Sequence, residues 1–351
     1  MLDYLGDPLA IALIGAFGGL LLGLAARMGR FCSLGAIEDA LYAGDGGRLR
    51  MWAFAIGIAV IATYGAAAIG IADIEESHYL ALGWNPLASI LGGLTFGYGM
   101  ALAGNCGFGA LARVGGGDFR SFVILLAMGL AAYATISGPL AALRVALFPV
   151  YPADGTLPGL PQVLGQATGL SVLPLAMIVG AALMALALSA REFRRSARMV
   201  IWSAVVGFAI VSGWIGSTWV AATGFSAMPI TSHTFAAPVG ETMLYLMTAS
   251  GRSLSFGVGS VAGVLAGAFI GSLVKGHFRW EACEDPRELR RQIFGAVLMG
   301  IGSVVAIGCT VGQGLSAFSV LALSAPVTAA AIFAGAALGL RQLITGFLPA
   351  E

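Results

Sequence analysis

Long stretches without a charged residue alternate along this chain with short segments that carry nearly all of its charges. Residues 51–72, 121–143 and 292–340 contain no Asp, Glu, Lys or Arg. A helix needs about 20 consecutive apolar residues to cross the hydrocarbon core of a bilayer. The pattern therefore predicts a chain of membrane-spanning helices joined by short polar loops.

Composition excludes the alternative of a very apolar soluble core. Only 10% of the 351 residues are charged and 58% are hydrophobic, whereas about 25% of residues are charged in soluble domains. We expect an all-α polytopic membrane protein with about nine transmembrane helices, forming a single transmembrane domain over residues 1–351. The nine predicted spans are 9–26, 51–72, 88–104, 121–143, 170–190, 199–220, 255–274, 292–308 and 326–346.

The basic residues predict the orientation of these spans. If the N-terminus lies outside, loops 27–50, 113–120, 191–198 and 275–291 and the C-terminal end fall in the cytoplasm, with 16 of the 18 Lys and Arg residues. Cytoplasmic loops of membrane proteins are enriched in Lys and Arg. The first apolar stretch follows Asp3 and Asp7 and precedes its basic residues, the reverse of a cleavable signal. We expect a multi-pass protein of the bacterial inner membrane with its C-terminus in the cytoplasm.

An internal duplication is visible when the chain is shifted by 203 residues. Glycines 92, 97, 99 and 109 then fall on glycines 295, 300, 302 and 312, while Cys106, Glu38 and Tyr42 fall on Cys309, Glu241 and Tyr245. We expect a first repeat in residues 1–150, a linking helix at 170–190 and a second repeat in 199–351. The linking helix inverts the second repeat, and inverted repeats with broken or re-entrant helices are typical of transporters.

Three of the four cysteines lie at glycine-rich breaks inside apolar segments. These are Cys32 in Gly29-Arg30-Phe31-Cys32-Ser33-Leu34-Gly35, Cys106 in Gly104-Asn105-Cys106-Gly107, and Cys309 in Gly308-Cys309-Thr310-Val311-Gly312-Gln313-Gly314. Non-helical backbone at membrane depth is tolerated where it is buried or lines a cavity. The three thiols are therefore candidates for contact with a transported solute. Cys283, in a charged loop, is expected to be incidental.

Other chemistry at these thiols is less well supported by the residues. No CxxC pair is present and there are only three histidines, which disfavours a zinc site or a thiol–disulfide enzyme. The twelve methionines do not cluster near the cysteines as a copper site would need. We expect no metal, no cofactor and no catalytic residue. A net charge of +1 gives no indication of a nucleic-acid partner, and membrane lipid is the expected surroundings.

Polar residues beside the breaks are supporting candidates with structural alternatives. Asn105 and Gln313 either contact the solute or hydrogen-bond the freed backbone. Arg30 either attracts an anion or only marks the cytoplasmic side. The repeat mates Glu38 and Glu241 lie at the predicted membrane edge, where acidic residues are functional candidates. The motif residues that complete this set are Gly107, Gly308, Thr310 and Gly312.

At these motifs the chain resembles the YeeE/YedE family of sulfur-compound membrane transporters. The resemblance covers nearly the whole chain, and it rests on Arg30–Ala36, on Gly97-Tyr98-Gly99 leading to Gly104–Gly107, and on Gly300-Ile301-Gly302 leading to Gly308–Gly314. It implies uptake of thiosulfate, with Cys106, Cys32 and Cys309 passing the anion along by transient thiol hydrogen bonds. It also implies a TusA-like sulfur-carrier protein as a cytoplasmic partner.

Within this resemblance we expect Cys106 to receive the anion from outside, Cys32 to lie centrally and Cys309 to hand it inward. Two alternatives stay open. One is a membrane-embedded sulfurtransferase that forms a persulfide on a cysteine, and the other is a transporter of a different sulfur or selenium species.

Overall fold

All regular elements in the described part of the chain are helices, as the apolar segments predict. The computed structural model describes residues 6–153, 158–282 and 285–346, so Asp154 and Cys283 lie outside the described residues. Each predicted span coincides with one long helix. These helices are α2 (Asp7–Leu24), α4 (Gly47–Ala68), α6 (Pro86–Ala103), α8 (Phe119–Ile136), α11 (Val172–Leu188), α13 (Ala197–Thr223), α15 (Phe256–Val274), α16 (Pro286–Val305) and α17 (Ser324–Thr345).

Seven of these nine helices are long and apolar enough to cross a membrane by themselves. The two others depart for identifiable reasons. Helix α11 has only 17 residues, and α16 carries Arg287, Glu288, Arg290 and Arg291 in its first two turns. The chain is thus an all-α, multi-pass membrane protein.

Several helix ends differ from the predicted boundaries by up to seven residues, and two of them have identifiable local causes. The span predicted to reach residue 143 ends at Ile136, and α9 (Ala141–Leu147) follows after the Ser137-Gly138-Pro139 break. Proline disfavours helical backbone at the residue before it, which explains this stop. The first helix continues as a π-helical turn, Ala25–Gly29. The Nζ of Lys275 donates to the carbonyls of Arg27 and Met28 there, at 2.8 and 3.2 Å.

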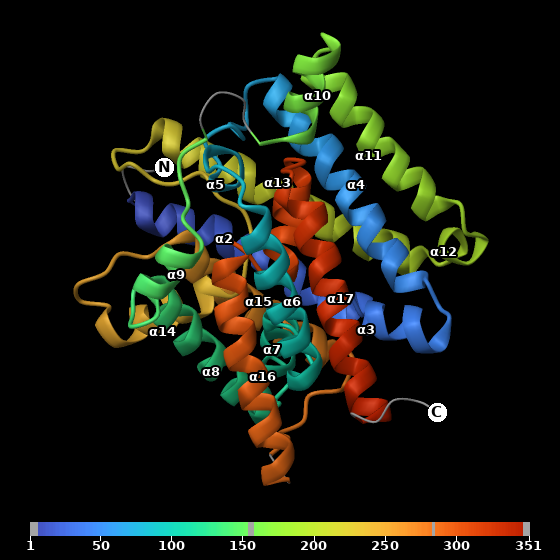
Figure 1. Cartoon of the computed structure of the whole chain (residues 1–351), viewed down its shortest axis with the longest axis vertical. Helices are drawn as coiled ribbons and strands as arrows, with labels where there is room; N and C mark the ends of the chain where they lie inside the picture. Colours follow the sequence, from blue (N-terminus) through green and yellow to red (C-terminus); the bar gives the residue numbers. More distant parts are fainter. Residues whose placement is uncertain (1–5, 154–157, 283–284, 347–351) are drawn as a thin grey trace.

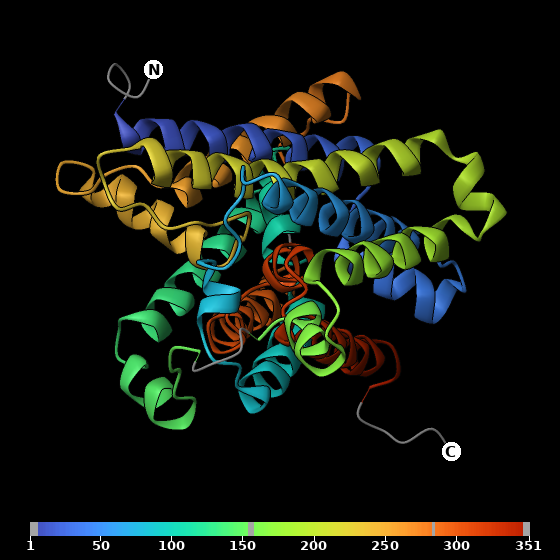
Figure 2. The same cartoon turned by 90° about the horizontal axis from the view of Figure 1, so that it is seen from above.

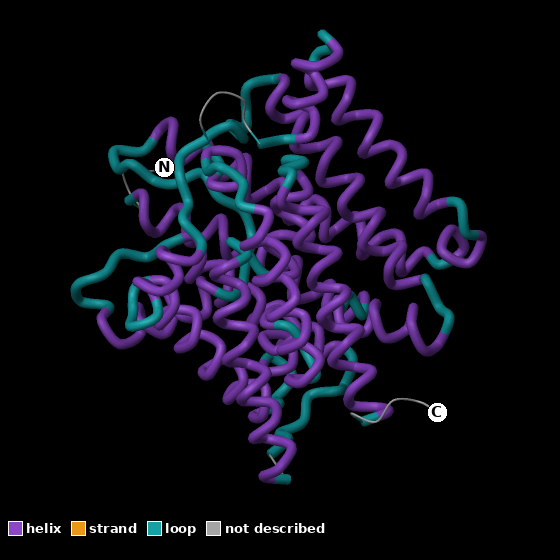
Figure 3. The backbone as a smooth tube through the Cα atoms, in the orientation of Figure 1, coloured by secondary structure: helices purple, strands orange, loops and turns teal. Residues whose placement is uncertain are grey.

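The long helices form two layers (Figures 1 and 2). In one layer the neighbours run in the order α15, α2, α13, α4 and α11, and in the other in the order α17, α6, α16 and α8. Between the layers lie short helices, and loop segments interrupt the helices in the interior (Figure 3). The short helices that matter here are α3 (Ser33–Glu38), α7 (Gly107–Val114), α14 (Ala237–Thr248) and the π-helix η3 (Gly312–Ala317).

Helices α6 and α16 approach each other through glycines that the offset of 203 exchanges. A β-carbon on Gly92 would lie 2.9 Å from the carbonyl oxygen of Gly302, and one on Gly302 would lie 2.7 Å from that of Gly92. In the same way, a β-carbon on Gly99 would lie 2.5 Å from the carbonyl oxygen of Gly295, and one on Gly295 would lie 2.6 Å from that of Gly99. Since Gly92 and Gly99 correspond to Gly295 and Gly302, each contact has its counterpart in the other repeat. The close approaches of α6 and α16 are thus reciprocal under the offset of 203.

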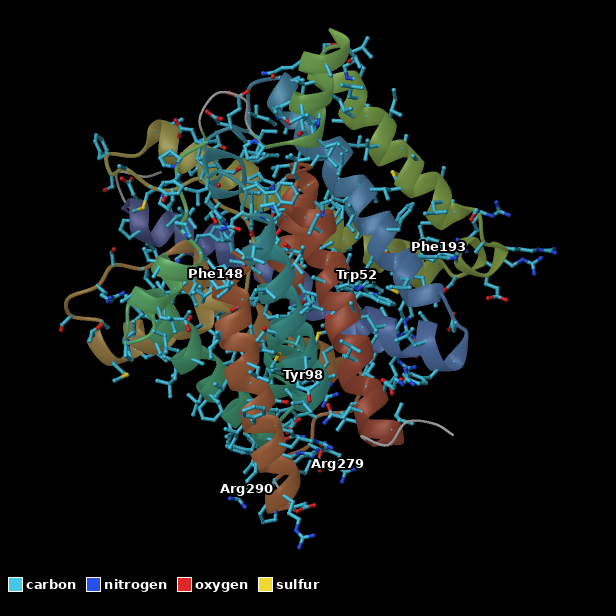
Figure 4. All side chains as sticks on the ribbon, in the orientation of Figure 1. Trp52, Tyr98, Phe148, Phe193, Arg279 and Arg290 are labelled. Atoms are coloured by element: carbon cyan, nitrogen blue, oxygen red, sulfur yellow. The ribbon has the colours of Figure 1, made fainter. Side chains whose placement is uncertain are left out.

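The basic loops gather at one end of the molecule, which we call the basic end. It comprises residues 27–30, 47–50, 113–120, 191–198, 275–282 and 285–291. Arg120 lies 3.9 Å from carboxylate oxygens of both Glu281 and Glu288, and Figure 4 shows Arg279 and Arg290 together at the lower edge. At the opposite end, the buried carboxylate of Asp7 accepts hydrogen bonds from the backbone N–H groups of Phe225 and Ser226.

Candidate functional site

Each of the three cysteines at the glycine breaks stands directly before a short interior helix. Cys32 is the N-cap residue of α3, and Cys106 is the N-cap residue of α7. Cys309 precedes Thr310 and the π-helix η3. All three are free thiols. Because the first N–H groups of a helix have no partner within it, the thiols lie where backbone donors converge.

Cys106 and Cys309 accept hydrogen bonds from the helices they precede. The Sγ of Cys106 accepts from the N–H of Gly109 at 3.3 Å, and the Sγ of Cys309 accepts from the N–H of Gly312 at 3.5 Å. Gly109 and Gly312 are themselves repeat mates. The two thiols therefore occupy equivalent positions, and both are buried with 1% of their surface exposed.

The Cys309 thiol receives further contacts from the loop before α14. The N–H of Phe235 donates to Sγ at 3.4 Å, and the Thr234 hydroxyl lies 3.5 Å from the same sulfur. Phe235 is the residue onto which Cys32 falls under the offset of 203. The second repeat thus offers a backbone donor and a hydroxyl where the first repeat has its third thiol.

The Cys106 thiol joins the segments that carry the other two cysteines. The hydroxyls of Ser33 and Thr310 and the thiol of Cys32 lie near its sulfur. Ser33 also donates to the sulfur of Met100 at 3.6 Å, which holds the start of α3 against α6. Cys32 itself is partly exposed. The fold thus brings Cys32, Cys106 and the residue next to Cys309 into one neighbourhood.

The hydrogen-bond partners of Cys106 and Cys309 among the described residues are uncharged. Asp7 and Asp118 are the buried charged residues of the described part of the chain. Asp7 binds the backbone of Phe225, and Asp118 accepts from Ser121, which in turn accepts from Asn105 beside Cys106. Two aromatic rings pack against each other beside the thiols, with the ring centroids of Phe108 and Phe235 5.4 Å apart. Within the described ranges no three His, Cys, Asp or Glu residues are grouped as metal ligands.

Gln313 and Asn105 bind backbone or neighbouring side chains. The Nε2 of Gln313 donates to the carbonyl oxygens of Ala306 and Ile307 at 2.9 and 3.1 Å. These hydrogen bonds satisfy two backbone carbonyl groups directly after the end of α16, where Ile307 has a positive φ of 54°. The Nδ2 of Asn105 donates to Ser121 at 3.3 Å, while its Oδ1 is buried without a partner among the described residues.

The remaining motif residues shape the break. A β-carbon on Gly312 would lie 2.6 Å from the Oγ1 of Thr234, and one on Gly107 would lie 2.7 Å from the Cε of Met128. Gly308 has φ 154° and is adjacent to Cys309. Thr310 is buried, and its hydroxyl forms no regular hydrogen bond with the described residues. It is therefore available to another group beside Cys106.

The charged candidates lie away from the thiols. Arg30 is exposed at the basic end with a left-handed backbone, φ 59°. Glu38 is exposed at the end of α3, where the neighbouring Asp39 pairs with Arg48 at 3.1 Å. Glu241 lines a cavity at the opposite end. None of the three is a hydrogen-bond partner of a cysteine among the described residues, although the cavity of Glu241 is also lined by Thr234, which contacts Cys309.

Cavities approach the centre from both ends. At the opposite end, a cavity of about 670 Å³ is lined by Glu76, Glu241 and Arg252, among others. A second cavity at this end, of about 270 Å³, is lined by Thr234, which contacts the sulfur of Cys309, and by Gly308, which precedes Cys309 in the sequence.

From the basic end, a cavity of about 160 Å³ extends from Leu49 and Trp52 to Ser33 and Thr310 beside Cys106. His78 lines both cavities at the opposite end, and burial lowers the pKa of His78 to about 4. The side chain is therefore neutral near pH 7.

The site and the two helix layers define a class: a multi-pass membrane protein whose interior helix breaks carry three free thiols, two of them buried, with cavities beside them. Residues 28–338 match the family described as Sulphur transport. The chain belongs to this family, and the resemblance to YeeE/YedE transporters is confirmed.

Two relatives are similar over most of their length. The thiosulfate transporter TsuA of Spirochaeta thermophila is 27% identical over 326 residues, which cover 88% of this chain and 92% of that protein. The thiosulfate transporter TsuA of Escherichia coli is 24% identical over 321 residues, covering 87% of each chain.

Several residues at the thiols escaped the sequence analysis. Thr234 and Phe235 contact Cys309 but belong to no motif identified in the sequence. Ser33 lies near Cys106 and is part of the Cys32 motif, but it was not singled out as a candidate. One signal pointed to Thr234 and Phe235. The offset of 203 places Cys32 on Phe235, and this match could have marked Phe235 and its neighbour Thr234 as candidates.

Proposed function

We propose that the protein takes up thiosulfate across the bacterial inner membrane, from the end opposite to the basic end, with the three thiols binding its terminal sulfur in turn. The observation that carries the proposal is the equivalent, buried and uncharged placement of Cys106 and Cys309 at the starts of interior helices. An S–H donor is less costly to bury than a charged group. Several weak sites also suit passage better than one tight site.

The cavities favour an order of the thiols different from the one expected from sequence. The cavity of about 270 Å³ adjoins Cys309 through Thr234, whereas the cavity from the basic end adjoins Cys106 through Ser33 and Thr310. The anion therefore meets Cys309 first and the pair of Cys106 and Cys32 afterwards. Release at the basic end would deliver it to the cytoplasm, where a TusA-like carrier protein is the proposed acceptor.

Replacing each cysteine with alanine tests the relay. Uptake of radiolabelled thiosulfate should fall at least tenfold in Cys32→Ala, Cys106→Ala and Cys309→Ala, at normal abundance in the membrane. Each change removes a small buried group, which costs about 1–2 kcal/mol of stability at most. Cys283→Ala is the matched control. Normal uptake by any of the three variants would remove that thiol from the path.

Labelling the two sulfur atoms separately distinguishes transport from the alternative, a sulfurtransferase. In transport both labels enter the cell together. In the transferase reaction a cysteine thiolate attacks the terminal sulfur, the S–S bond of thiosulfate breaks, and sulfite leaves while a cysteine persulfide remains. Retention of only the terminal-sulfur label, with sulfite outside, would replace the transport proposal. Selenosulfate and sulfite as competitors test the other substrate classes.

A further inference from the structure

The loop before α14 ends in a buried stretch without regular secondary structure, and every residue of this stretch is bound by another part of the chain. We call residues 231–235 the interior segment. Its first two residues are held by hydrogen bonds to α13, at 3.1 and 2.7 Å. Its last two residues, Thr234 and Phe235, contact the sulfur of Cys309. Between these two pairs lies His233, whose side chain is fully buried.

His233 binds two further elements of the fold. Its Nδ1 and the Oγ of Ser260 in α15 lie 2.7 Å apart and share a hydrogen bond. Its backbone carbonyl accepts a hydrogen bond of 2.7 Å from the hydroxyl of Ser316 in η3. The ring is closely surrounded, because a β-carbon on Gly18 of α2 would lie 2.1 Å from Nε2 and the ring centroid of Phe256 lies 4.9 Å away. The imidazole thus fixes the interior segment against α2 and α15.

The two backbone donors of the Cys309 thiol are joined through His233. One donor is the N–H of Phe235, two residues further along the interior segment, at 3.4 Å from the sulfur. The other is the N–H of Gly312 at 3.5 Å, in the same π-helix η3 that Ser316 ties to the carbonyl of His233. Hydrogen bonds weaken steeply when their geometry is disturbed. The position of His233 therefore decides whether both donors converge on one sulfur atom.

This convergence determines what the Cys309 thiol offers to a solute. A thiol is a weak donor through its S–H group and a weak acceptor through its sulfur. Because the N–H groups of Phe235 and Gly312 occupy the acceptor side of the sulfur, the S–H proton is the part of the thiol that is left to bind a further group. A donor that is held in place before its partner arrives also loses less freedom on binding.

We propose that His233 is a positioning residue, which holds the interior segment through its hydrogen bond to Ser260 so that Cys309 presents an S–H donor to the terminal sulfur of thiosulfate. This inference rests on the proposed function, and it adds the residue that prepares one of the three thiols. Because His233 is fully buried, it acts through Cys309 and not on the solute.

The S–H stretching band in the infrared spectrum tests the proposal directly, since its frequency reports the hydrogen bonding of the thiol. The other three cysteines are replaced with alanine, so that Cys309 gives the only band. Ser260→Ala removes the hydrogen bond and keeps the imidazole. Ser272→Ala is the matched control, because Ser272 is a buried serine of the same helix that donates to a carbonyl of its own helix, at 2.7 Å. Ser260→Ala should shift the band, and Ser272→Ala should leave it in place.

Uptake of radiolabelled thiosulfate by the protein with all four cysteines provides the second measurement. Ser260→Ala and His233→Leu should each lower uptake about fivefold at normal abundance in the membrane, as loss of one hydrogen bond suggests. His233→Asn, whose amide replaces Nδ1, should recover most of the activity. The double variant Ser260→Ala/His233→Leu should be no slower than His233→Leu, because both changes break the same bond.

An unchanged S–H band in Ser260→Ala would overturn the proposal, as would an equal shift in Ser272→Ala. A shifted band with normal uptake would also contradict it, since the thiol would then not need this positioning. If His233→Leu is missing from the membrane, the band and the uptake of Ser260→Ala decide. Failure of the proposed function looks different: the wild type then transports no thiosulfate, while the S–H band of Ser260→Ala still shows whether His233 positions Cys309.

Discussion

Replacing Gly312 with alanine tests whether the close approach at Cys309 is needed, because the repeat mate Gly109 offers a matched control. A β-carbon at Gly312 would lie 2.6 Å from the Oγ1 and 3.2 Å from the Cβ of Thr234, and 3.1 Å from the hydroxyl oxygen of Tyr79. Real β-carbons do not approach other atoms within 3.0 Å. A β-carbon at Gly109 would instead lie 3.5 Å from Asn105 and 3.7 Å from the sulfur of Cys106, which are ordinary contacts.

The expected cost follows from this difference. Both glycines lie in short helices, so alanine gains a similar helix preference of up to about 1 kcal/mol at each. Overpacking a closed site costs about 1–3 kcal/mol. Gly312→Ala should therefore be less stable than Gly109→Ala by about 1–3 kcal/mol. Because Thr234 contacts the sulfur of Cys309, uptake should fall in Gly312→Ala as well.

Thermal unfolding of the two variants purified in detergent, together with thiosulfate uptake in cells, measures both effects. The double variant Gly312→Ala/Thr234→Ala removes the atom at 2.6 Å and should recover part of the lost stability, but not uptake if the Thr234 hydroxyl assists Cys309. Equal stability of Gly312→Ala and Gly109→Ala would refute the packing argument. Lower stability of Gly109→Ala would contradict it more strongly.

Two further predictions concern pH and orientation. The folded-state pKa of His78 is about 4, below the ordinary value of about 6.5, so the unfolded chain binds more protons than the folded chain between these pH values. The melting temperature should therefore fall as pH decreases from about 6.5 toward 4, and His78→Gln should flatten this dependence. An identical pH profile of the two proteins would contradict this prediction. A topology reporter fused at Ala197 or Asp285 should give a cytoplasmic signal and one fused at Asp154 a periplasmic signal, as the clustering of Lys and Arg predicts. A periplasmic signal at Ala197 would reverse the proposed orientation.

The sequence by itself determined the class of protein and the positions of its long helices. Membrane spans require about 20 apolar residues, so uncharged stretches such as 51–72 correspond to helices like α4 (Gly47–Ala68) within a few residues. The cysteines were identifiable for a similar reason, since glycine-rich breaks are conspicuous in an otherwise helical pattern. The match of Cys106 to Cys309 followed from a comparison of the chain with itself.

Only the tertiary structure decided what surrounds each thiol. The contact of Thr234 and Phe235 with Cys309 joins residues 74 and 75 positions apart, and no local pattern encodes such pairs. The roles of Gln313 and Glu241 were ambiguous in sequence because a polar side chain serves either a solute or a neighbour. The fold assigns Gln313 to two backbone carbonyls and places Glu241 on the wall of a cavity that Thr234, a neighbour of Cys309, also lines. Arg144, one of the two basic residues outside the predicted cytoplasmic segments, lines a cavity beside Cys309. The sequence could not show this, because the packing of distant helices determines which side chains share a cavity.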